Sequence, residues 1–463
     1  MKIYVASSWR NDIQPLVVEA LRAAGHEVYD FKNPEPGNHG FHWSDIDPAW
    51  ESQSAEEFRK ALAHPIAEYG FGLDMKALRE CDACVCVLPC GRSAHLEAGY
   101  TIGAGKPTVI LLQNGEPELM YKMTPYIALD IQEVVECIKT INQKTNGGYK
   151  SMTNELIFDS FGKPSAMVRI PRFYMDEVIV GAPHVPHPVF IVDGAEIPEI
   201  YVSKYQNIVV DGKAYSLPFQ QPTVSVNFDD AVKACESKGK GWHLLTNAEW
   251  AAIALWSKKN GTLPRGNNNW GSDYEHEDEK GICFDGCKVL TGSGPDAWSH
   301  DHTPEGIFDL NGNVREWVGG LRLLDGEIQV IPDNDAAKHI DQSQQSHEWK
   351  PLLLDGKSIR YSETEDGIKV TTEEQDDGWN GCQFSDLETD IQVPDAMKAL
   401  GLFPTDDAKL TDYFWAGLSG EKLPVRGGYW TYTSRAGVFN VSLGNPRSNV
   451  STSIGFRSAF VNL

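Results

Sequence analysis

The sequence predicts a Rossmann-like (flavodoxin-like) α/β domain followed by an α+β domain. Residues 1–145 alternate short apolar strands with helices, which is typical of a parallel sheet covered by helices. Over residues 166–463 strand signals follow one another, and two strong helix signals interrupt them. The polar stretch 146–165, with Gly147 and Gly148, is the expected linker, and 463 residues suffice for two or three cores.

Local signals define the elements of the first domain. Asp12 is expected to cap the first helix and Gly25 to end it, while Ser54 and Glu57 form a capping box for the second. The predicted strands are Lys2–Ser7, Glu27–Phe31, Ala83–Leu88 and Thr108–Leu112. The predicted helices are Ile13–Ala24, the one after Ser54, Asp74–Cys81, Ala94–Gly103 and Ile131–Gln143.

The second domain is predicted from strand runs and one more capping box. Its predicted strands are Ala166–Phe173, Val178–Val180, Val189–Val192 and Ile200–Tyr205. Its helices are Phe228–Lys238 and one that Thr246 and Glu249 open and that runs to Trp256. Residues 306–318 are predicted to form strand, turn and strand, with Asn311-Gly312 as the turn.

Composition excludes several classes of partner. Lys+Arg 41 against Asp+Glu 65 gives a net charge of −24, which argues against sequence-independent binding to nucleic acid or an anionic membrane. No apolar run approaches the roughly 18 residues of a membrane-spanning helix, and MKIYVASSWRN leads directly into a strand. We expect a cytoplasmic protein. Of its nine cysteines, Cys81, Cys84, Cys86 and Cys90 fall in one short apolar run, and Cys81-x-x-Cys84 is interpreted as buried thiols beside a strand rather than a metal or redox pair.

Polar residues follow two strands of the first domain where a parallel sheet binds its ligands. Ser7-Ser8-Trp9-Arg10 ends the first strand, and the stretch from Pro89 to Tyr100 follows the third. Ser93 is expected to cap the next helix, which puts Glu97 near the positive end of the helix dipole. A carboxylate there keeps a low pKa and suits a nucleophile that attacks the anomeric carbon of a nucleoside.

These residues resemble the nucleoside 2-deoxyribosyltransferase family. The resemblance covers about 140 residues and rests on three groups: Ile3-Tyr4-Val5-Ala6-Ser7, Asp74 before Cys81-Asp82, and Ser93-x-x-x-Glu97-x-Gly99-Tyr100 leading to Gly105-Lys106-Pro107. It implies that Glu97 is the nucleophile, that Tyr4 orients it and that Asp74 helps to hold the base or sugar. Family members have an aspartate six residues before the glutamate, where this chain has Gly91.

That departure leaves the reaction open. An N-glycosidase acting on a nucleotide fits the loop as well, with the phosphate at Arg92 and the helix N-terminus. The nucleotide-binding candidates are Ser7, Arg10, Arg92, Ser93 and His95. A non-catalytic nucleotide-binding domain, with Glu97 acting only on its helix and a solvated His95, is the other alternative.

The second domain resembles the formylglycine-generating-enzyme branch of the C-type-lectin fold. The resemblance runs from Pro222 to the C-terminus and includes Asn311-Gly312-Asn313-Val314-Arg315-Glu316-Trp317, Arg426-Gly427-Gly428 and Gly455-Phe456-Arg457. The oxidases of this branch need two cysteines near the final motif, and this chain has none after Cys382. The iron-dependent relatives need a histidine triad on a separate helical domain, which is not found here before residue 222. We therefore expect the fold without formylglycine-generating activity.

The C-terminal stretch 425–463 combines strand-like ends with a polar centre. Trp430, Phe439, Ile454 and Phe456 are expected in the core. Between them lie small polar or tyrosyl residues of the kind that recognition surfaces use. These are Tyr429, Thr431, Tyr432, Thr433, Asn440, Ser442, Gly444, Asn445, Val450, Ser451 and Ser453.

This stretch resembles the variable region of proteins diversified by retroelements, which follows RGGSWxx…AGVFxLxLxNxRSNxxxxIGFRxA on a C-type-lectin fold. In that family adenine-directed mutagenesis rewrites codons such as AAC, and the polar residues of the stretch are Asn or lie within one or two base changes of it. The resemblance implies a surface that binds a protein or another macromolecule. The alternative is a fixed Ser/Thr-rich hairpin surface.

The polar insert 321–424 contains an acidic run, Glu363–Asp377, which we interpret as a solvated loop or edge hairpin. A calcium site is the alternative, and no other cofactor or metal is expected. Two functions stay open: a diversified ligand-binding protein with a nucleotide-directed N-terminal domain, or a nucleoside-metabolising enzyme with an accessory lectin-like domain. A phage adhesin is a third, and homo-oligomers are compatible with all of them.

Overall fold

The computed structural model describes residues 1–35, 37–113, 118–146, 154–375, 377–406 and 408–463. The chain divides into two compact units, Met1–Ser151 and Met152–Leu463, and each is described by itself. The predicted boundary at Gly147 and Gly148 lies outside the described residues. The remaining part of the expected linker is not loop throughout, because residues 154–158 already form a strand of the second unit.

The first unit is a five-stranded sheet flanked by helices. Every neighbouring pair of strands is parallel, and the order β2-β1-β3-β4-β5 is that of flavodoxin-like sheets. The strands are β1 (Lys2–Ala6), β2 (Glu27–Asp30), β3 (Ala83–Val87), β4 (Thr108–Leu111) and β5 (Tyr126–Ala128). The helices are α1 (Gln14–Ala23), α2 (Ala55–Ala61), α3 (Pro65–Glu80), α4 (Arg92–Gly103) and α5 (Ile131–Asn146).

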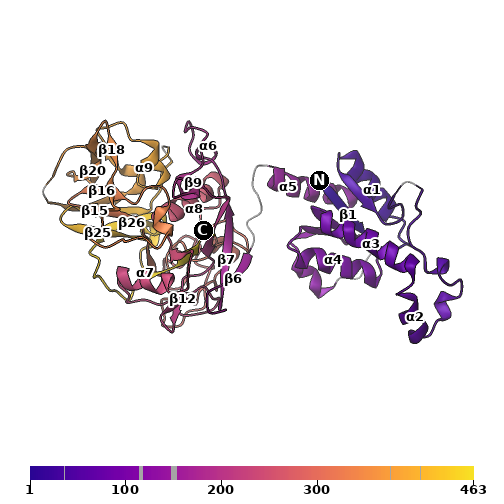
Figure 1. Ribbon diagram of the computed structural model, residues 1–463. Coiled ribbons are helices and arrows are strands. Elements are labelled where there is room, and N and C mark those ends of the chain that lie inside the picture. Colours follow the sequence, from indigo (N-terminus) through magenta and orange to yellow (C-terminus); the bar gives the residue numbers. More distant parts are fainter. Residues whose placement is uncertain (36, 114–117, 147–153, 376, 407) are drawn as a thin grey trace. The chain divides into compact units, whose positions relative to one another are not determined.

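Two apolar layers cover this sheet because successive strand residues point to opposite faces. Ile3 and Val5 of β1 pack with residues of α1 and α5, whereas Tyr4 and Ala6 pack with residues of α3 and α4. Figure 1 shows α1 on one side of β1 and α3 and α4 on the other.

Two helix starts differ from the prediction. Asn11, not Asp12, caps α1, since its Oδ1 accepts from the amides of Ile13 (2.7 Å) and Gln14 (3.1 Å). Helix α3 begins at Pro65, nine residues before the predicted start at Asp74. Its first half was not predicted because Gly70 and Gly72 weaken the helix signal there. The capping box that precedes α2 is confirmed.

The second unit contains two main sheets. The smaller has the order β13-β28-β10-β7-β6, so the last strand of the chain lies among early strands of the unit. Its strands are β6 (Asn154–Phe158), β7 (Pro164–Pro171), β10 (Glu199–Ser203), β13 (Trp242–Leu244) and β28 (Ser458–Phe460). Helices of the unit are α6 (Met175–Val178), α7 (Phe228–Glu236), α8 (Asn247–Asn260) and α9 (Asp395–Ala399).

The larger sheet has the path β22-β24-β26-β25-β15-β16-β20-β21-β23, with β14, β17 and β27 attached. Its strands are β14 (Arg315–Trp317), β15 (Leu321–Leu324), β16 (Glu327–Val330), β17 (Lys350–Pro351), β20 (Arg360–Glu363), β21 (Ile368–Thr371), β22 (Trp379–Gln383), β23 (Glu388–Thr389), β24 (Tyr413–Gly417), β25 (Glu421–Gly427), β26 (Gly437–Asn445) and β27 (Ile454–Phe456). Three small pairs are β8 (Ile191–Val192) with β9 (Ala195–Glu196), β11 (Ile208–Val210) with β12 (Lys213–Tyr215), and β18 (Leu353–Leu354) with β19 (Lys357–Ser358).

Helix α8 is the centre of the second unit. The predicted capping box of Thr246 and Glu249 is present, and most of the helix is buried on all sides. Trp250 is fully buried, and its Nε1 donates to the carbonyl of Val438 in β26 at 2.7 Å. This contact fixes the C-terminal stretch against the central helix.

Some predictions for the second unit are wrong. The predicted strand Val178–Val180 is absent, because Val178 ends helix α6 and residues 179–180 form a bend and a turn. The Glu177 carboxylate accepts from the amide of Tyr174 and opens this helical turn. Of the strand, turn and strand predicted for residues 306–318, only the second strand, β14, is present. The first is absent because Asp309 has a φ of 63° and the Phe308 amide donates to the Lys204 carbonyl instead of to a hairpin partner.

The insert is partly core rather than wholly solvated. Strands β20 and β21 form an antiparallel hairpin around the start of the acidic run. It is not the predicted edge hairpin, because β21 also pairs with β23 and Ile368 and Val370 are fully buried. Asp376 lies outside the described residues. A search of the described helices for a stretch long and apolar enough to span a membrane found none.

Candidate functional site

Two strand ends of the first unit meet where such a sheet binds ligands. In the order β2-β1-β3 the chain leaves β1 and β3 in different directions, and the carboxyl ends of these strands form the switch point. Ser7 follows β1, and its Oγ donates to the carbonyl of Val87 at the end of β3 at 2.8 Å. Ser7 therefore joins the two strand ends.

Tyr4, Asp74 and Glu97, which were predicted from separate parts of the sequence, form one cluster. Tyr4 is fully buried in β1. Burial, and then the charges of Glu97 and Asp74, raise the pKa of the Tyr4 hydroxyl far above its usual range. Among the described groups the Tyr4 hydroxyl has no partner of hydrogen-bond geometry. A buried hydroxyl without a partner is costly, so it is a ready donor to a ligand or to Glu97.

Tyr29 completes this cluster and was not predicted. Its hydroxyl donates to Asp74 Oδ1 at 2.8 Å, and its ring stacks on Tyr4 with 5.3 Å between centroids. Burial, and then the Asp74 charge, raise the pKa of Tyr29. Burial also raises the pKa of Asp74. Tyr4 and Tyr29 are register partners in β1 and β2, which an alternation of apolar residues alone does not show.

The electrostatics of Glu97 differ from the prediction. Helix α4 begins at Arg92 with Gly91 as its N-cap, and Ser93 does not cap it. Glu97 thus lies in the second turn, and the dipole effect falls off within the first. Burial, and then the charge of Asp74, raise the pKa of Glu97 to about 7, a shift that Tyr4 opposes only in part. Near neutral pH the carboxyl group is therefore a mixture of acid and carboxylate.

This raised pKa predicts a pH-dependent effect of Glu97→Gln on stability. The pKa rises from 4.5 to about 7 in the folded state, which therefore holds the proton more tightly than the unfolded chain over that window. The wild type consequently loses stability as the pH rises through the window, whereas glutamine stays neutral. Thermal unfolding at about pH 5 and about pH 8 should show the larger gain for Glu97→Gln at the higher pH. An equal gain at both values would contradict a raised pKa.

The remaining predicted residues lie after β1 and in the first turns of α4. Arg10 is exposed, 3.9 Å from Glu51, and Arg92 and Ser93 are exposed in the first turn of α4. That turn holds no acidic residue and its N-cap makes no side-chain bond, so its amides could hold an anion. His95 lies 3.0 Å from the Tyr121 hydroxyl through Nε2.

An aromatic group lies at the same end of the sheet. The ring of Trp9, just after β1, is 5.4 Å from that of Phe31 and 4.1 Å from that of His42. Trp9 is partly exposed, so this group offers a surface for stacking. Only the position of Trp9 after a strand signalled it in the sequence.

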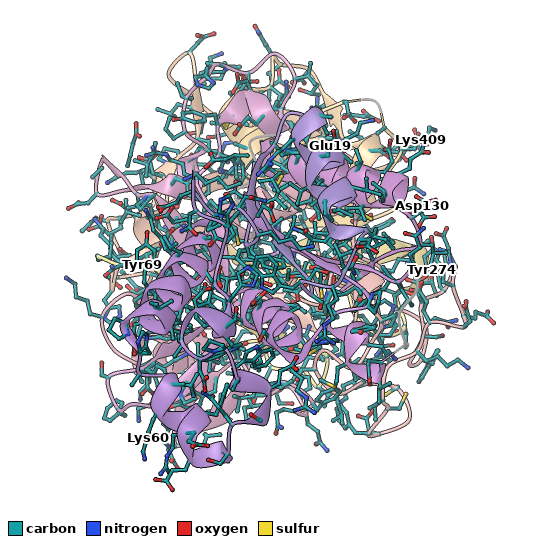
Figure 2. All side chains as sticks on the ribbon, turned by 90° about the vertical axis from the view of Figure 1, so that its right-hand side faces the viewer. Glu19, Lys60, Tyr69, Asp130, Tyr274 and Lys409 are labelled. Atoms are coloured by element: carbon teal, nitrogen blue, oxygen red, sulfur yellow. The ribbon has the colours of Figure 1, made fainter. Side chains whose placement is uncertain are left out.

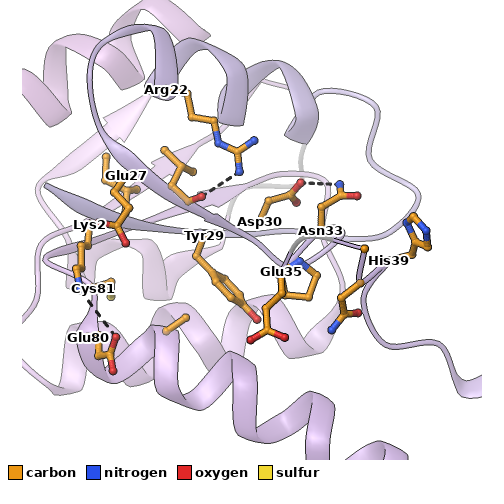
Figure 3. Close-up of a pocket in the computed structure, with 16 residues that line it drawn as sticks. Lys2, Arg22, Glu27, Tyr29, Asp30, Asn33, Glu35, His39, Glu80 and Cys81 are labelled. Carbon is orange, nitrogen blue, oxygen red and sulfur yellow. Dashed lines mark hydrogen bonds and ion pairs between the residues drawn. The ribbon is translucent and has the colours of Figure 1, made fainter.

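A cavity of about 510 Å³ lies beside the cluster, not on it. Tyr29 and Glu35 line it, and Figure 3 shows it between β2 and α3, with Lys2 and Glu80 3.9 Å apart at one end. Glu97 does not line it. The cavity therefore belongs to the neighbourhood of Tyr29 and is not the pocket of the predicted nucleophile.

In the second unit, two loops carry most of the exposed residues of the C-terminal stretch. Tyr429–Thr433 lies between β25 and β26, and Val450–Ser451 lies between β26 and β27. Within these two segments Thr433 and Val450 are exposed and the other residues are half-buried. Elsewhere in the same two loops Arg435, Pro446, Ser448 and Thr452 are exposed. Trp430 is half-buried below Lys288, whose Nζ is 5.0 Å from its ring, so it is not a core residue as predicted. Phe439, Ile454 and Phe456 are in the core.

Arg315 joins these two loops. Its Nη2 donates to Ser453 Oγ at 2.9 Å, and its guanidinium lies 4.9 Å from the ring centroid of Tyr429 and 5.8 Å from that of Tyr432. The two tyrosine rings are 4.1 Å apart. We call the half-buried residues Arg315, Tyr429, Tyr432 and Ser451 the tyrosine surface.

Four predicted surface residues are buried instead: Asn440, Ser442, Asn445 and Ser453. For the residues of β26 the cause is strand β24 of the insert, which pairs in parallel with β26 and sets Trp415 beside Ser442. Ser453 instead lies under Arg315 and Ser451. A side chain at Gly444 would meet Trp379 of β22 at 2.2 Å, so that ring covers this position. Sequence reasoning missed Trp379, Tyr413 and Trp415 because nothing in the sequence assigned the insert to this face.

A calcium site in the acidic run was the alternative interpretation. Within the described part of the chain, no group of three or more His, Cys, Asp or Glu side chains is placed to hold a metal ion.

Comparison with known proteins places the second unit in context. Residues 139–331 match the family model described as the sulfatase-modifying factor enzyme 1-like domain. This match covers less than half of the chain, and over it the chain is similar to a sulfatase-modifying factor enzyme 1-like domain. Such a domain implies the C-type-lectin-like fold that the sequence predicted.

Two solved structures are similar to parts of this chain. The CMP N-glycosidase BcmB of Clostridium botulinum is 17% identical, with a TM-score of 0.18, over 30% of this chain and 99% of that one. Treponema denticola variable protein 1 is 13% identical, with a TM-score of 0.29, over 67% of this chain and 99% of that one. At these scores neither likeness assigns a function. A search of curated proteins found no match.

Proposed function

We propose that this chain is a retroelement-diversified protein that binds a protein or other macromolecule through the tyrosine surface. The observation that carries the proposal is the contrast within the C-terminal stretch. Exposed or half-buried hydroxyl and tyrosyl side chains occupy two loops, while Phe439, Ile454 and Phe456 hold the strands beside them in the core. Side chains on such loops can change while the strands stay in place.

The backbone conformation of Thr433 also supports diversification. Thr433 is exposed and adopts a φ of 49°, a left-handed conformation that β-branched residues adopt rarely and asparagine more easily. A backbone suited to asparagine but occupied by threonine is what rewriting of an AAC codon would leave behind. A residue chosen for the loop's own stability would be Asn or Gly.

Variation at exposed positions is expected to leave stability nearly unchanged. Val450→Ala should shift the free energy of unfolding by no more than about 0.5 kcal/mol, because the side chain is 55% exposed. Asn440→Ala should cost about 1 to 2 kcal/mol, because it removes the 2.7 Å bond from Asn440 Nδ2 to the Arg435 carbonyl in the interior. Chemical denaturation of the second unit measures both, and an equal cost would contradict the assignment of exposed and buried positions.

The proposal is tested by sequencing this gene in many cells of one population. Differences should concentrate in the codons for 429, 431, 432, 433, 450 and 451 and spare those for Phe439, Ile454 and Phe456. Codons as uniform as the rest of the gene would favour a fixed surface.

We propose further that the N-terminal unit cleaves an N-glycosidic bond of a nucleotide. The grouping of Tyr4, Tyr29, Asp74 and Glu97 at the switch point supports this, because paired carboxyl groups of raised pKa suit glycosyl transfer. The Glu97 carboxylate would attack C1′, the bond to the base would break, and the base would leave with a proton from solvent. Water would then hydrolyse the glycosyl ester and release the sugar.

The surrounding residues suit the two ends of a nucleotide. Arg92 and the uncapped first turn of α4 would hold the phosphate, and Trp9 would stack on the base. Incubation with pyrimidine and purine nucleosides and their monophosphates, followed by chromatography, tests the activity. Release of free base from monophosphates would support an N-glycosidase, and exchange between bases would support a transferase. No release from any of them would favour nucleotide binding alone.

A homo-oligomer formed through the first unit is also expected. Large apolar side chains are exposed on α3, α4 and the 3₁₀ helix Leu119–Met123: Ile66, Tyr69, Phe71, Leu96, Leu119 and Met120. Figure 2 shows the side chain of Tyr69, one of these residues. Because exposed apolar patches often mark interfaces, Leu96→Glu should lower the sedimentation coefficient toward that of the monomer. A wild-type protein that is already monomeric would contradict the expectation.

A further inference from the structure

Cys86 and Cys90 bring two thiols together at the end of β3. Their Sγ atoms are 3.7 Å apart, and a disulfide of about 2.05 Å would need a closure of roughly 1.7 Å. Cys86 is fully buried on the face of the sheet that also holds Tyr4, and Cys90 is half-buried in the connection to α4. The Cys90 thiol is therefore accessible to a reagent in solution, and the Cys86 thiol is buried next to it.

The surroundings of Cys90 favour its thiolate. His95, in the first turn of α4, has its Nδ1 3.5 Å from Cys90 Sγ and 3.0 Å from the Gly91 carbonyl oxygen. The hydrogen bond from Cys86, and then the charge of His95, lower the pKa of Cys90 to about 7. The pKa of Cys86 is raised by its bond to Cys90 and by burial. Thiols with a pKa near the ambient pH attack disulfides fastest.

We propose that Cys86 and Cys90 form a reversible thiol–disulfide site whose substrates are small disulfides such as glutathione disulfide. In the first step the Cys90 thiolate attacks one sulfur of the small disulfide, forms a mixed disulfide and releases one thiolate. In the second step Cys86 loses its proton and attacks the Cys90 sulfur, which releases the second thiol. The two protein thiols are oxidised to one disulfide, and the small disulfide is reduced to two thiols.

This site adjoins the proposed nucleophile. The charge of Cys90 contributes to the raised pKa of Glu97, after burial and Asp74. Formation of the disulfide removes that charge. It also moves Cys90, in the segment between β3 and Arg92, closer to Cys86. A change in Glu97-dependent base release on oxidation would follow, and this consequence alone rests on the proposed N-glycosidase. The redox site itself does not depend on that activity.

Mass spectrometry of the full-length protein after incubation with glutathione disulfide tests the proposal. The expected product lacks two hydrogen atoms, yields a cross-linked Cys86–Cys90 peptide and is reversed by dithiothreitol. Cys86→Ser should retain a stable glutathione adduct on Cys90, because the second step is lost. Cys137→Ser is the matched control, since Cys137 is also half-buried, and it should leave the cross-link unchanged.

Two results would overturn the proposal. One is a lasting glutathione adduct on Cys90 in the wild type with no cross-link. The other is an unreacted Cys90 in a protein whose exposed Cys283 has formed the adduct. If Cys86→Ser does not fold, Cys86→Ala serves the same purpose, and the wild-type peptide map decides without either variant.

Discussion

Replacing Glu97 by glutamine is expected to lower base release from nucleotides by about a thousandfold or more. Glutamine keeps the size and hydrogen-bonding reach of the side chain but cannot form the glycosyl ester, and removal of a catalytic nucleophile typically has effects of this order. Chromatography of the released base in single-turnover reactions measures it. Glu80→Gln is the matched control, because Glu80 is an exposed glutamate of α3 at the amino-terminal edge of the sheet, 3.9 Å from Lys2.

The same reaction should depend on pH. Attack requires the carboxylate, and the pKa of Glu97 is raised to about 7 by burial and by Asp74. Base release should therefore fall as the pH drops through about 7, and not near the usual pKa of a glutamate. Full activity of Glu97→Gln, or a rate that stays constant down to about pH 5, would remove Glu97 from the reaction.

Replacing Arg457 by methionine is expected to cost the second unit about 3 to 5 kcal/mol of unfolding free energy. Arg457 and Glu316 are almost completely buried, and Nε and Nη2 of the arginine each lie 2.6 Å from a Glu316 oxygen. Nη1 also donates to the carbonyl of Ser203 at 3.1 Å. Methionine would leave the Glu316 charge buried without its partner, and that desolvation is the source of the cost.

The control for this prediction is Arg172→Met. Arg172 is paired with Glu196 at 2.7 Å near the surface, so its loss should cost no more than about 1 kcal/mol. Urea denaturation followed by a signal of the second unit compares the two variants. The double variant Arg457→Met with Glu316→Leu should recover part of the loss, because it removes the unpaired charge. Similar midpoints for Arg457→Met and Arg172→Met would contradict the buried pair.

The N-terminal fold and the centre of its candidate site could be predicted because their signals are local. Strands and helices alternate along the chain. Glu97 lies early in the helix that follows β3, so it was expected near the carboxyl end of that strand, where the site is. Tyr29 was missed because it joins the cluster through the pairing of β1 with β2. The prediction of a low pKa for Glu97 was wrong because it assumed that Ser93 caps the helix, whereas α4 begins at Arg92.

The second unit shows the same division between local and tertiary information. The capping box of α8 was predictable from four neighbouring residues. The burial of Asn440 and Ser442 was not, since it depends on β24, which reaches β26 from the insert. The core positions Phe439, Ile454 and Phe456 followed from strand alternation, while Trp430 lies in the loop after β25, beside Lys288. Residues in the loops could be named, but not which of them reach solvent.

The proposed diversified surface is tested most directly by sequencing the DNA that flanks this gene. If the surface is diversified, a near-copy of the codons for residues 425–463 is expected beside a gene for a reverse transcriptase. The copy should differ at adenines, and the differing codons should include those of Tyr429, Thr431, Tyr432, Thr433 and Val450. Flanking DNA without such a copy or a reverse transcriptase would contradict the account and leave a fixed lectin-like surface in its place.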